Sequence, residues 1–389
     1  MIKERIHIIV LMWLLGSFMG ACSNSESINF VDEGRFLIEE GEILLSRWMT
    51  EDSLQRNLSS IYPYAGIPRV VIETEDLLEI NDRETEIPAK MRIWGERYPE
   101  TGLMEMTIRG RGNLSWSMHQ KSYKLEFKNK QTLLGMPKDR DWALISNYAD
   151  KSLMKNYLMY HLATKMGMPY VPRCEYVELY LNKEYLGVYL LTETIKKSQN
   201  RVNLRQDEMS YIVEIDAKFR DGEQVIFSDV ISPGGKPFHI HEPQNASIES
   251  LDLLETFIQS FEKYLKGISF EKNNGLEQWV DIDEYIKHYW LQEFSKNPDA
   301  NFYTSVYFSW TRNGVVNMGP IWDFDLSFGG HRNEVTSLPT GWHIKNSYWN
   351  NYIFRDSVLE NSRIRFWQEN KEKFLGLSAD ADSLYGFLE

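Results

Sequence analysis

The sequence predicts an α+β protein with two lobes, a β-rich lobe over about residues 67–200 and a helix-rich lobe over about residues 201–389. Two observations support this class. In the first half, apolar and polar residues alternate in short segments, which is the period of half-buried strands. In the second half, apolar residues recur every three or four positions over longer segments, as on one face of a helix. The length allows one large domain or two closely packed lobes.

Residues 1–21 have the pattern of a lipoprotein signal peptide. A short basic region at Lys3 and Arg5 precedes an apolar core, and the segment ends Gly20-Ala21-Cys22, which resembles a bacterial lipobox. Cys22 is therefore expected to carry the lipid; ordinary secretion with a chance cysteine is the alternative. Residues 22–66 are predicted to form a tether and an amphipathic helix. The protein is thus expected in the cell envelope, anchored to a membrane or to the cell surface.

The strands of the first lobe follow from alternation and from β-branched and aromatic content. In the best example, Tyr123, Leu125 and Phe127 share one face, whereas Lys124 and Glu126 share the other. The predicted strands are Arg69–Glu73, Ala89–Trp94, Leu103–Arg109, Ser122–Lys128, Tyr176–Leu181, Tyr185–Thr192 and Tyr211–Ile215.

The helices are predicted from apolar periodicity and from their end signals. Asp281 and Glu284 form a possible capping box at the start of one helix, and Pro298 stops it. The predicted helices are Leu153–Met166, residues 246–266, Asp281–Asn297 and Asp356–Leu375.

Two aspartate sites flank a predicted β-hairpin. The strands are Thr304–Trp310 and Val315–Met318, and Asn313-Gly314 between them is a strong turn signal because both positions tolerate a positive φ. Reflection about that turn places Asp323 opposite Thr304, only a few residues after Asp299. The two aspartates are therefore expected at the same open end of the hairpin.

These aspartates have the chemistry of a metal-dependent transfer site. Asp323 and Asp325 point the same way if the chain is extended, and carboxylates are good ligands of hard cations such as Mg²⁺. Asp299 could accept or position a hydroxyl proton. The alternative is a helix-ending turn followed by an acidic loop.

A basic glycine-containing turn lies upstream, at Arg109-Gly110-Arg111-Gly112-Asn113 between two predicted strands. Glycines let backbone N–H groups approach a ligand, and arginines supply fixed positive charge, so with Lys121 and Lys124 the segment could hold phosphate. The alternative is a surface turn with basic flanks. The chain has no Walker-type phosphate loop.

Three further residues or pairs have the chemistry of possible sites. Glu193 ends an apolar strand and could pair with a lysine, although a solvated strand end is the simpler interpretation. His239 and His241 could face one ion, but the sequence shows no third strong ligand nearby, which favours a strand or loop surface. Cys174 is interpreted as a packed thiol rather than a nucleophile.

The net charge of −13 argues against nucleic acid as a partner, because binding to phosphate backbones needs a basic surface. It does not exclude phosphate in one local basic pocket.

From about Ile67 to Gly330 the chain resembles the spore coat protein H (CotH) kinase family, in its Bacteroides-type lipoprotein form. The matching segments are RGRGNLSW followed by KSYKLEF, DWALISNYADKSLMKN, YVPRCEYVELYLNKEYLGVYLLTETI, and KNPDANFY with MGPIWDFDLSFGG. The resemblance implies an atypical protein-kinase-like fold over residues 67–389 and phosphate transfer from ATP to a protein hydroxyl.

The resemblance also implies roles for individual residues. Asp299 would be the catalytic aspartate, and Asp323, supported by Asp325, would bind Mg²⁺ or Mn²⁺. The residues implied in ATP binding are Arg111, Asn113, Glu193 and one lysine. Lys124 is the favoured lysine, and Lys121 is the less favoured one. Family members often carry Asn five residues after the catalytic aspartate, where this chain has Thr304.

The leading functional prediction is therefore a kinase-like phosphotransferase domain on an envelope lipoprotein, with ATP and an unidentified protein acceptor as partners. A non-catalytic surface protein that binds glycans or a protein partner through its Trp and Tyr side chains is the first alternative. A metal-dependent glycosyltransferase is the second, but that class expects a parallel sheet before the Asp-x-Asp motif, whereas this chain shows hairpins.

Overall fold

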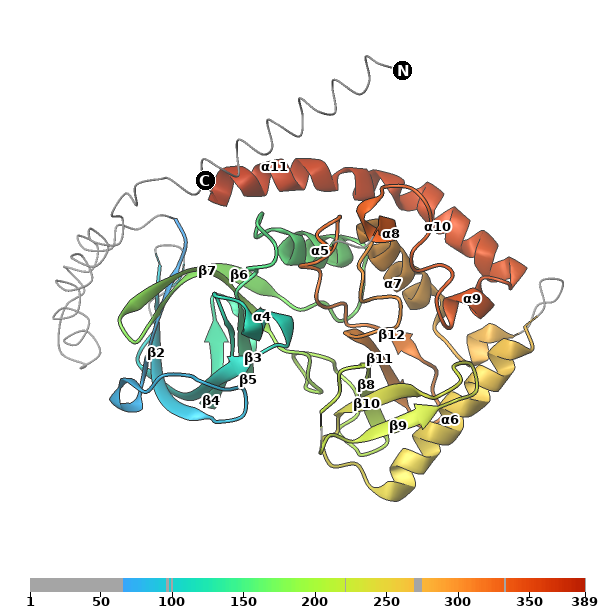
Figure 1. Cartoon of the computed structure of the whole chain (residues 1–389), viewed down its shortest axis with the longest axis horizontal. Helices are drawn as coiled ribbons and strands as arrows, with labels where there is room; N and C mark the ends of the chain where they lie inside the picture. Colours follow the sequence, from blue (N-terminus) through green and yellow to red (C-terminus); the bar gives the residue numbers. More distant parts are fainter. Residues whose placement is uncertain are drawn as a thin grey trace, which may run out of the picture.

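The computed structural model describes residues 66–388, apart from 96–97, 99–100, 221, 269–274 and 332–333. The predicted signal peptide, the lipidation site Cys22 and the predicted helix around residues 36–49 lie outside the described residues. Within them, a closed barrel precedes a five-stranded sheet that is covered by helices (Figure 1). The mixed α and β content, with a β-rich first part and helices at the C-terminus, agrees with the predicted class.

The barrel contains seven strands in the order β1-β2-β3-β4-β5-β7-β6. It closes where β1 pairs in parallel with β6, so that neither strand is left as a free edge. The strands are β1 (Arg69–Thr74), β2 (Ile87–Trp94), β3 (Met104–Arg111), β4 (Ser122–Leu133), β5 (Met136–Ile145), β6 (Cys174–Leu181) and β7 (Glu184–Glu193).

Alternation along these strands fills the barrel. In β2, Ile87, Ala89, Met91 and Ile93 are buried, and the residues between them face outward. In β4 the inward set includes Tyr123, Leu125 and Phe127, as the sequence predicted, which leaves Lys124 on the outer face. Side chains on the outer face are thus available to a site beside the barrel.

The second sheet is antiparallel, in the order β12-β11-β8-β10-β9. One face carries Val213, Phe238, Ile240 and Phe308, all buried in the main core. Its strands are β8 (Ser210–Ile215), β9 (Val225–Ser228), β10 (Lys236–Glu242), β11 (Val306–Thr311) and β12 (Asn317–Met318). The C-terminal part therefore contains a sheet as well as the predicted helices.

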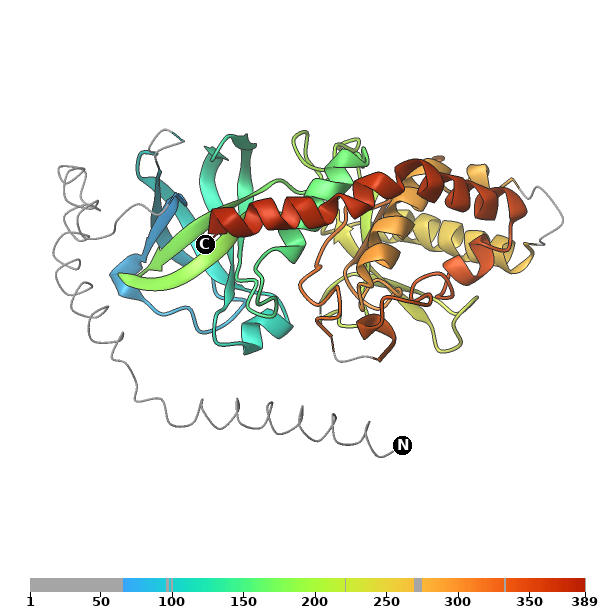
Figure 2. The same cartoon turned by 90° about the horizontal axis from the view of Figure 1, so that it is seen from above.

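The helices of at least eight residues are α5 (Lys155–Lys165), α6 (Ile248–Lys266), α7 (Ile282–Ser295), α10 (Ser357–Leu375) and α11 (Leu377–Leu388). The shorter ones are α4 (Leu114–Ser117), α8 (Glu334–Ser337) and α9 (Asn350–Ile353). In both views α10 and α11 run end to end from the helices of the second part to the barrel (Figures 1 and 2). Lys165 of α5 pairs with Asp380 of α11, with 2.7 Å between nitrogen and oxygen.

The start of α7 agrees with the sequence in part. Asp281 caps it by accepting a hydrogen bond from the Glu284 N–H at 2.9 Å. The capping box is incomplete because the Asp281 N–H donates to the Val316 carbonyl at 2.9 Å, and one carboxylate oxygen of Glu284 is buried without a partner. The helix ends at Ser295, before the predicted end, because Lys296 adopts a left-handed conformation with φ 51°. That turn starts the loop that carries Asp299.

Candidate active site

The two aspartate segments meet beside the C-terminal end of α7, as the sequence predicted. The Asn297 side-chain amide donates a hydrogen bond to the Asp323 carbonyl oxygen at 3.0 Å. Its side-chain oxygen accepts one from the Asp299 N–H at 3.2 Å. Because Asn297 is buried, this single side chain fixes the spacing of the two loops.

The hairpin that brings them together is shifted by one residue from its predicted register. Phe308 pairs with Met318, which centres the turn on Asn313, where φ is 64°. The register therefore places Asp323 opposite Tyr303 rather than Thr304. The second strand is also shorter than predicted, because Val316 instead exchanges hydrogen bonds with the backbone just before α7.

Asp323 and Asp325 come together, but not through an extended chain. Asp323 has φ 64°, in the left-handed region, so the condition of an extended backbone is not met. The two carboxyl groups nevertheless hydrogen-bond to each other. Burial raises the pKa of both groups, and at Asp325 the charge of Asp323 raises it further. Such a pair shares a proton at neutral pH or is neutralised by a cation.

Asp299 is electrostatically coupled to this pair. Burial raises the pKa of Asp299 to about 6, the charge of Asp323 adds to this effect, and Lys218 and His331 oppose it. A carboxyl group with such a pKa is mostly ionised at neutral pH and can still accept a proton.

A fourth carboxylate, Asp216, was missed by sequence reasoning. It follows β8, is buried, and accepts a hydrogen bond of 2.6 Å from the Thr304 hydroxyl. Its charge is among those that raise the pKa of Asp299. Thr304 thus positions a carboxylate beside the site. A polar residue that directly follows an apolar strand was the available signal.

The barrel contributes a cation through Arg111, at the end of β3. Its guanidinium lies 4.7 Å from the centroid of the Trp322 ring. Burial lowers the Arg111 pKa, whereas Tyr307, Tyr160 and Asp323 raise it. The predicted phosphate-binding arginine is therefore next to the predicted metal-binding aspartate, although the two come from different parts of the fold.

Residues 108–385 match the model of the family described as CotH kinase protein. The chain belongs to the CotH kinase family. Among curated proteins, no sequence matches it.

The other residues of the basic glycine-containing turn at 109–113 have structural roles. The Gly110 N–H donates to the Asp82 carbonyl at 3.0 Å, and a Cβ atom there would lie 2.4 Å from Trp116. Asn113 is exposed and accepts a hydrogen bond of 2.7 Å from Arg83. Gly110 is thus required by packing, and its N–H is already used.

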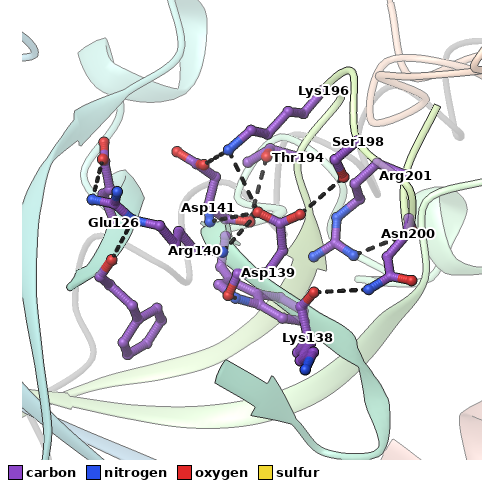
Figure 3. A network of polar contacts seen from close by, with 12 residues as sticks. Glu126, Lys138, Asp139, Arg140, Asp141, Thr194, Lys196, Ser198, Asn200 and Arg201 are labelled. Atoms are coloured by element: carbon purple, nitrogen blue, oxygen red, sulfur yellow. Dashed lines mark hydrogen bonds and ion pairs between the residues drawn. The ribbon is translucent and has the colours of Figure 1, made fainter. Parts of the chain in front are cut away.

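Lys124 lies on the outer face of the barrel, between the carboxylates of Asp141 at 3.4 Å and Glu126 at 3.5 Å. Asp141 also pairs with Lys196. Figure 3 shows how Asp139, Asp141, Lys196 and neighbouring side chains join β5 to the segment after β7. Lys124 borders this network, and the contacts described for it lead to Asp141 and Glu126 rather than to Asp299 or Asp323. Lys121 instead contacts Trp116, whose carbonyl accepts its hydrogen bond at 2.8 Å.

Glu193 is buried in an ion-pair cluster. Its carboxylate lies 2.6 Å from Arg201 and 2.8 Å from Arg173. These contacts hold the loop after β7 against the barrel. The simple solvated strand end considered from the sequence is therefore wrong, because the exposed fraction of Glu193 is 2%. Its contacts, too, lead away from the aspartates.

A second cation near the site, Lys155, was missed. Its ammonium group donates to the Asp325 carbonyl at 3.0 Å and lies 3.8 Å from Asp150. The next residue, Asn156, accepts a hydrogen bond of 2.8 Å from the Phe324 N–H. The start of α5 thus supports the Asp323–Asp325 loop, as Asn297 does. The motif DWALISNYADKSLMKN was the available signal.

Two sizeable cavities lie elsewhere. One of about 870 Å³ is beside β2 and β3, and one of about 880 Å³ is between α7 and α10. Neither is lined by Asp299, Asp323 or Asp325. We locate the active site where the charged side chains converge, because catalysis of group transfer depends on positioned charges more than on the size of a cavity. No helix in the described part of the chain is both long and apolar enough to cross a membrane.

Proposed function

We propose that this protein is an ATP-dependent phosphotransferase of the cell envelope that phosphorylates a hydroxyl group of a protein. The observation that carries the proposal is the convergence of Asp299 with the Asp323–Asp325 pair, through Asn297, near Arg111. Phosphoryl transfer requires mainly positioning and neutralisation of charge, so a small set of such groups is sufficient.

The acidic pair fits a hard divalent cation. Asp323 and Asp325 supply carboxylate oxygens, which Mg²⁺ and Mn²⁺ prefer, and burial raises the pKa of both groups, so a bound cation would offset the cost of two buried charges. The Ser305 hydroxyl donates to Asp323 at 3.3 Å and helps to orient it. A bound Mg²⁺ would neutralise phosphate oxygens during transfer.

In the proposed reaction, the other charged residues of the site contact the acceptor hydroxyl and the phosphate. Asp299 orients the acceptor hydroxyl and takes its proton as the hydroxyl oxygen bonds to the γ-phosphorus of ATP. The bond from that phosphorus to the bridging oxygen breaks, and ADP leaves. Arg111 holds phosphate oxygens by charge and is itself oriented by the Trp322 ring. The ammonium group of Lys155 donates to the Asp325 carbonyl, so a second cation lies beside the acidic pair.

The test is phosphorylation by purified protein with labelled ATP and Mg²⁺ or Mn²⁺. Asp323→Ala is expected to abolish activity, and Asp299→Asn to lower kcat by about 100-fold or more with a smaller change in KM. Asp252→Asn, on the exposed face of α6, is the matched control and should retain activity. Equal activity of Asp299→Asn and the wild type would refute the proposal.

One observation favours a second candidate function, glycan binding without catalysis. The cavity of about 880 Å³ is lined by Trp290, Trp342 and Trp367, and Trp342 is 46% exposed. Exposed indole rings beside a cavity suit stacking on a sugar ring. Glycan binding that is lost in Trp342→Ala and unaffected by Asp299→Asn would support this function.

A further inference from the structure

The polar face of the second sheet holds a cluster that the proposed phosphotransfer does not use. Its members are Glu214 on β8 with His239 and His241 on β10. One ligand atom from each side chain lies within 4.8 Å of the others. The sequence had shown only the two histidines, and β-pairing of His239 with Glu214 supplies the third ligand.

The distances are close to those of a metal site. The Glu214 carboxylate lies 3.7 Å from Nδ1 of His239 and 4.0 Å from Nδ1 of His241. Ligands of a tetrahedral zinc ion are about 3.3 Å apart when the bonds are about 2.0 Å. The two Glu214 distances exceed this value by about 0.4 and 0.7 Å, and the ligand atoms of the two histidines lie within 4.8 Å of each other, so side-chain movements of up to about 1.5 Å would close the site. The two imidazole rings are nearly perpendicular, at 87°, so they approach the common point from different directions.

Local backbone structure creates this arrangement. The register of β10 against β8 shifts between Ile240 and Glu242, which leaves His241 as the extra residue of a β-bulge. A bulge bends the strand and changes the direction of a side chain, and bulges are frequent near functional sites. Both histidines are partly buried, so their orientation is restrained while a small ion can still reach them.

The second polar partner of each histidine leaves the ring nitrogen that faces Glu214 available to a metal. Nε2 of His241 lies 2.9 Å from the Ile195 carbonyl, which can only accept, so that nitrogen carries the proton and Nδ1 keeps its lone pair. Nε2 of His239 faces the Glu223 carboxylate at 3.8 Å. A carbonyl or carboxylate behind each ligating histidine is the usual support of a metal centre.

We propose that Glu214, His239 and His241 bind a divalent transition metal, with Zn²⁺ as the best fit. Two imidazoles and one carboxylate favour such ions over Mg²⁺, which prefers oxygen ligands alone. Three protein ligands leave a fourth position open to water or to an oxygen of a bound molecule. Glu214 also interacts with Arg111 and Tyr307, so a metal here would alter the charge next to the phosphotransfer site.

The test is a titration of Zn²⁺ into the full-length chain, purified without a polyhistidine tag, treated with chelator and kept in excess Mg²⁺. One Zn²⁺ should bind per chain. His239→Gln and His241→Gln should each weaken binding more than about 100-fold, and Glu223→Gln, behind a ligand, about 10-fold to 100-fold. His161→Gln, an exposed histidine on α5, is the matched control and should bind as the wild type does.

The absorption spectrum of bound Co²⁺ tests the site in the wild-type protein, without any substitution. Co²⁺ in the wild type should show the intense visible absorption of a four-coordinate site, and Zn²⁺ should remove it. Asp323→Ala should retain Zn²⁺ binding, which separates this site from the phosphotransfer site. The proposal is overturned by no stoichiometric binding, by a weak six-coordinate Co²⁺ spectrum, or by folded histidine variants that bind as tightly as the wild type.

Discussion

Replacement of Glu193 by Gln is expected to destabilise the fold rather than to weaken ATP binding. Glu193 and Arg201 both have side chains that are 2% exposed, and their charged atoms are 2.6 Å apart. Two other nitrogen atoms of Arg201 are buried without a partner, and the third contacts the Glu193 carboxylate and, at 3.3 Å, the Pro137 carbonyl. Glu193→Gln would leave the guanidinium buried without its counter-ion.

The expected magnitude follows from burial. Removal of one partner of a buried ion pair lowers the free energy of unfolding by about 3 to 5 kcal/mol. We expect about 3 kcal/mol, because glutamine can still accept a hydrogen bond from the Arg173 N–H, now 3.1 Å from the carboxylate. Burial raises the Glu193 pKa even though Arg201 and Arg173 oppose it, so the ion pair itself bears a desolvation cost. The double variant Glu193→Gln with Arg201→Met should therefore be more stable than Glu193→Gln alone.

The assay is urea denaturation of the wild type, both single variants and the double variant, with the Michaelis constant for ATP measured in parallel. Glu105→Gln is the control, because Glu105 pairs with Lys128 on the exposed surface of the barrel and its loss should not measurably change stability. Wild-type stability in Glu193→Gln, together with a raised KM for ATP, would refute this reasoning and restore the nucleotide contact that the family resemblance implied.

Three further predictions concern other buried groups. His288 is buried, and burial lowers its pKa to about 4, below its value in the unfolded chain, so the free energy of unfolding should fall as pH drops from about 6.5 towards 4. Between pH 7 and 5 the wild type should lose about 2 kcal/mol of unfolding free energy that His288→Leu retains, as measured by urea denaturation. Asn156→Ala should cost about 2 kcal/mol and also lower kcat, since it leaves the Phe324 N–H without its acceptor; unchanged kcat would argue against its role in supporting the loop. Arg111→Met should raise the KM for ATP about tenfold or more, and Arg111→Lys should restore binding only in part because lysine cannot stack flat on Trp322.

Local patterns accounted for much of the secondary structure. The strand Ser122–Lys128 was predicted because its alternation matches the inward and outward positions of the barrel wall. Strand β5, Met136–Ile145, was missed because Lys138, Asp139, Arg140 and Asp141 obscure any apolar period. Those charges are accommodated by partners about 50 to 60 residues away, such as Lys196 and Ser198, that no local pattern could indicate.

The sequence by itself determined the chemical identity of the candidate site: two aspartate segments held near each other by one hairpin, which is a short-range arrangement. Closure of the barrel depended on pairing of β1 with β6, more than a hundred residues apart. Arg111 and Asp323 are likewise far apart in the sequence, and Glu214 meets the two histidines only through the pairing of β8 with β10. Such contacts arise from strand order and register across the whole fold. Only the tertiary structure could therefore decide which of the predicted charged residues share a site and which hold the fold together.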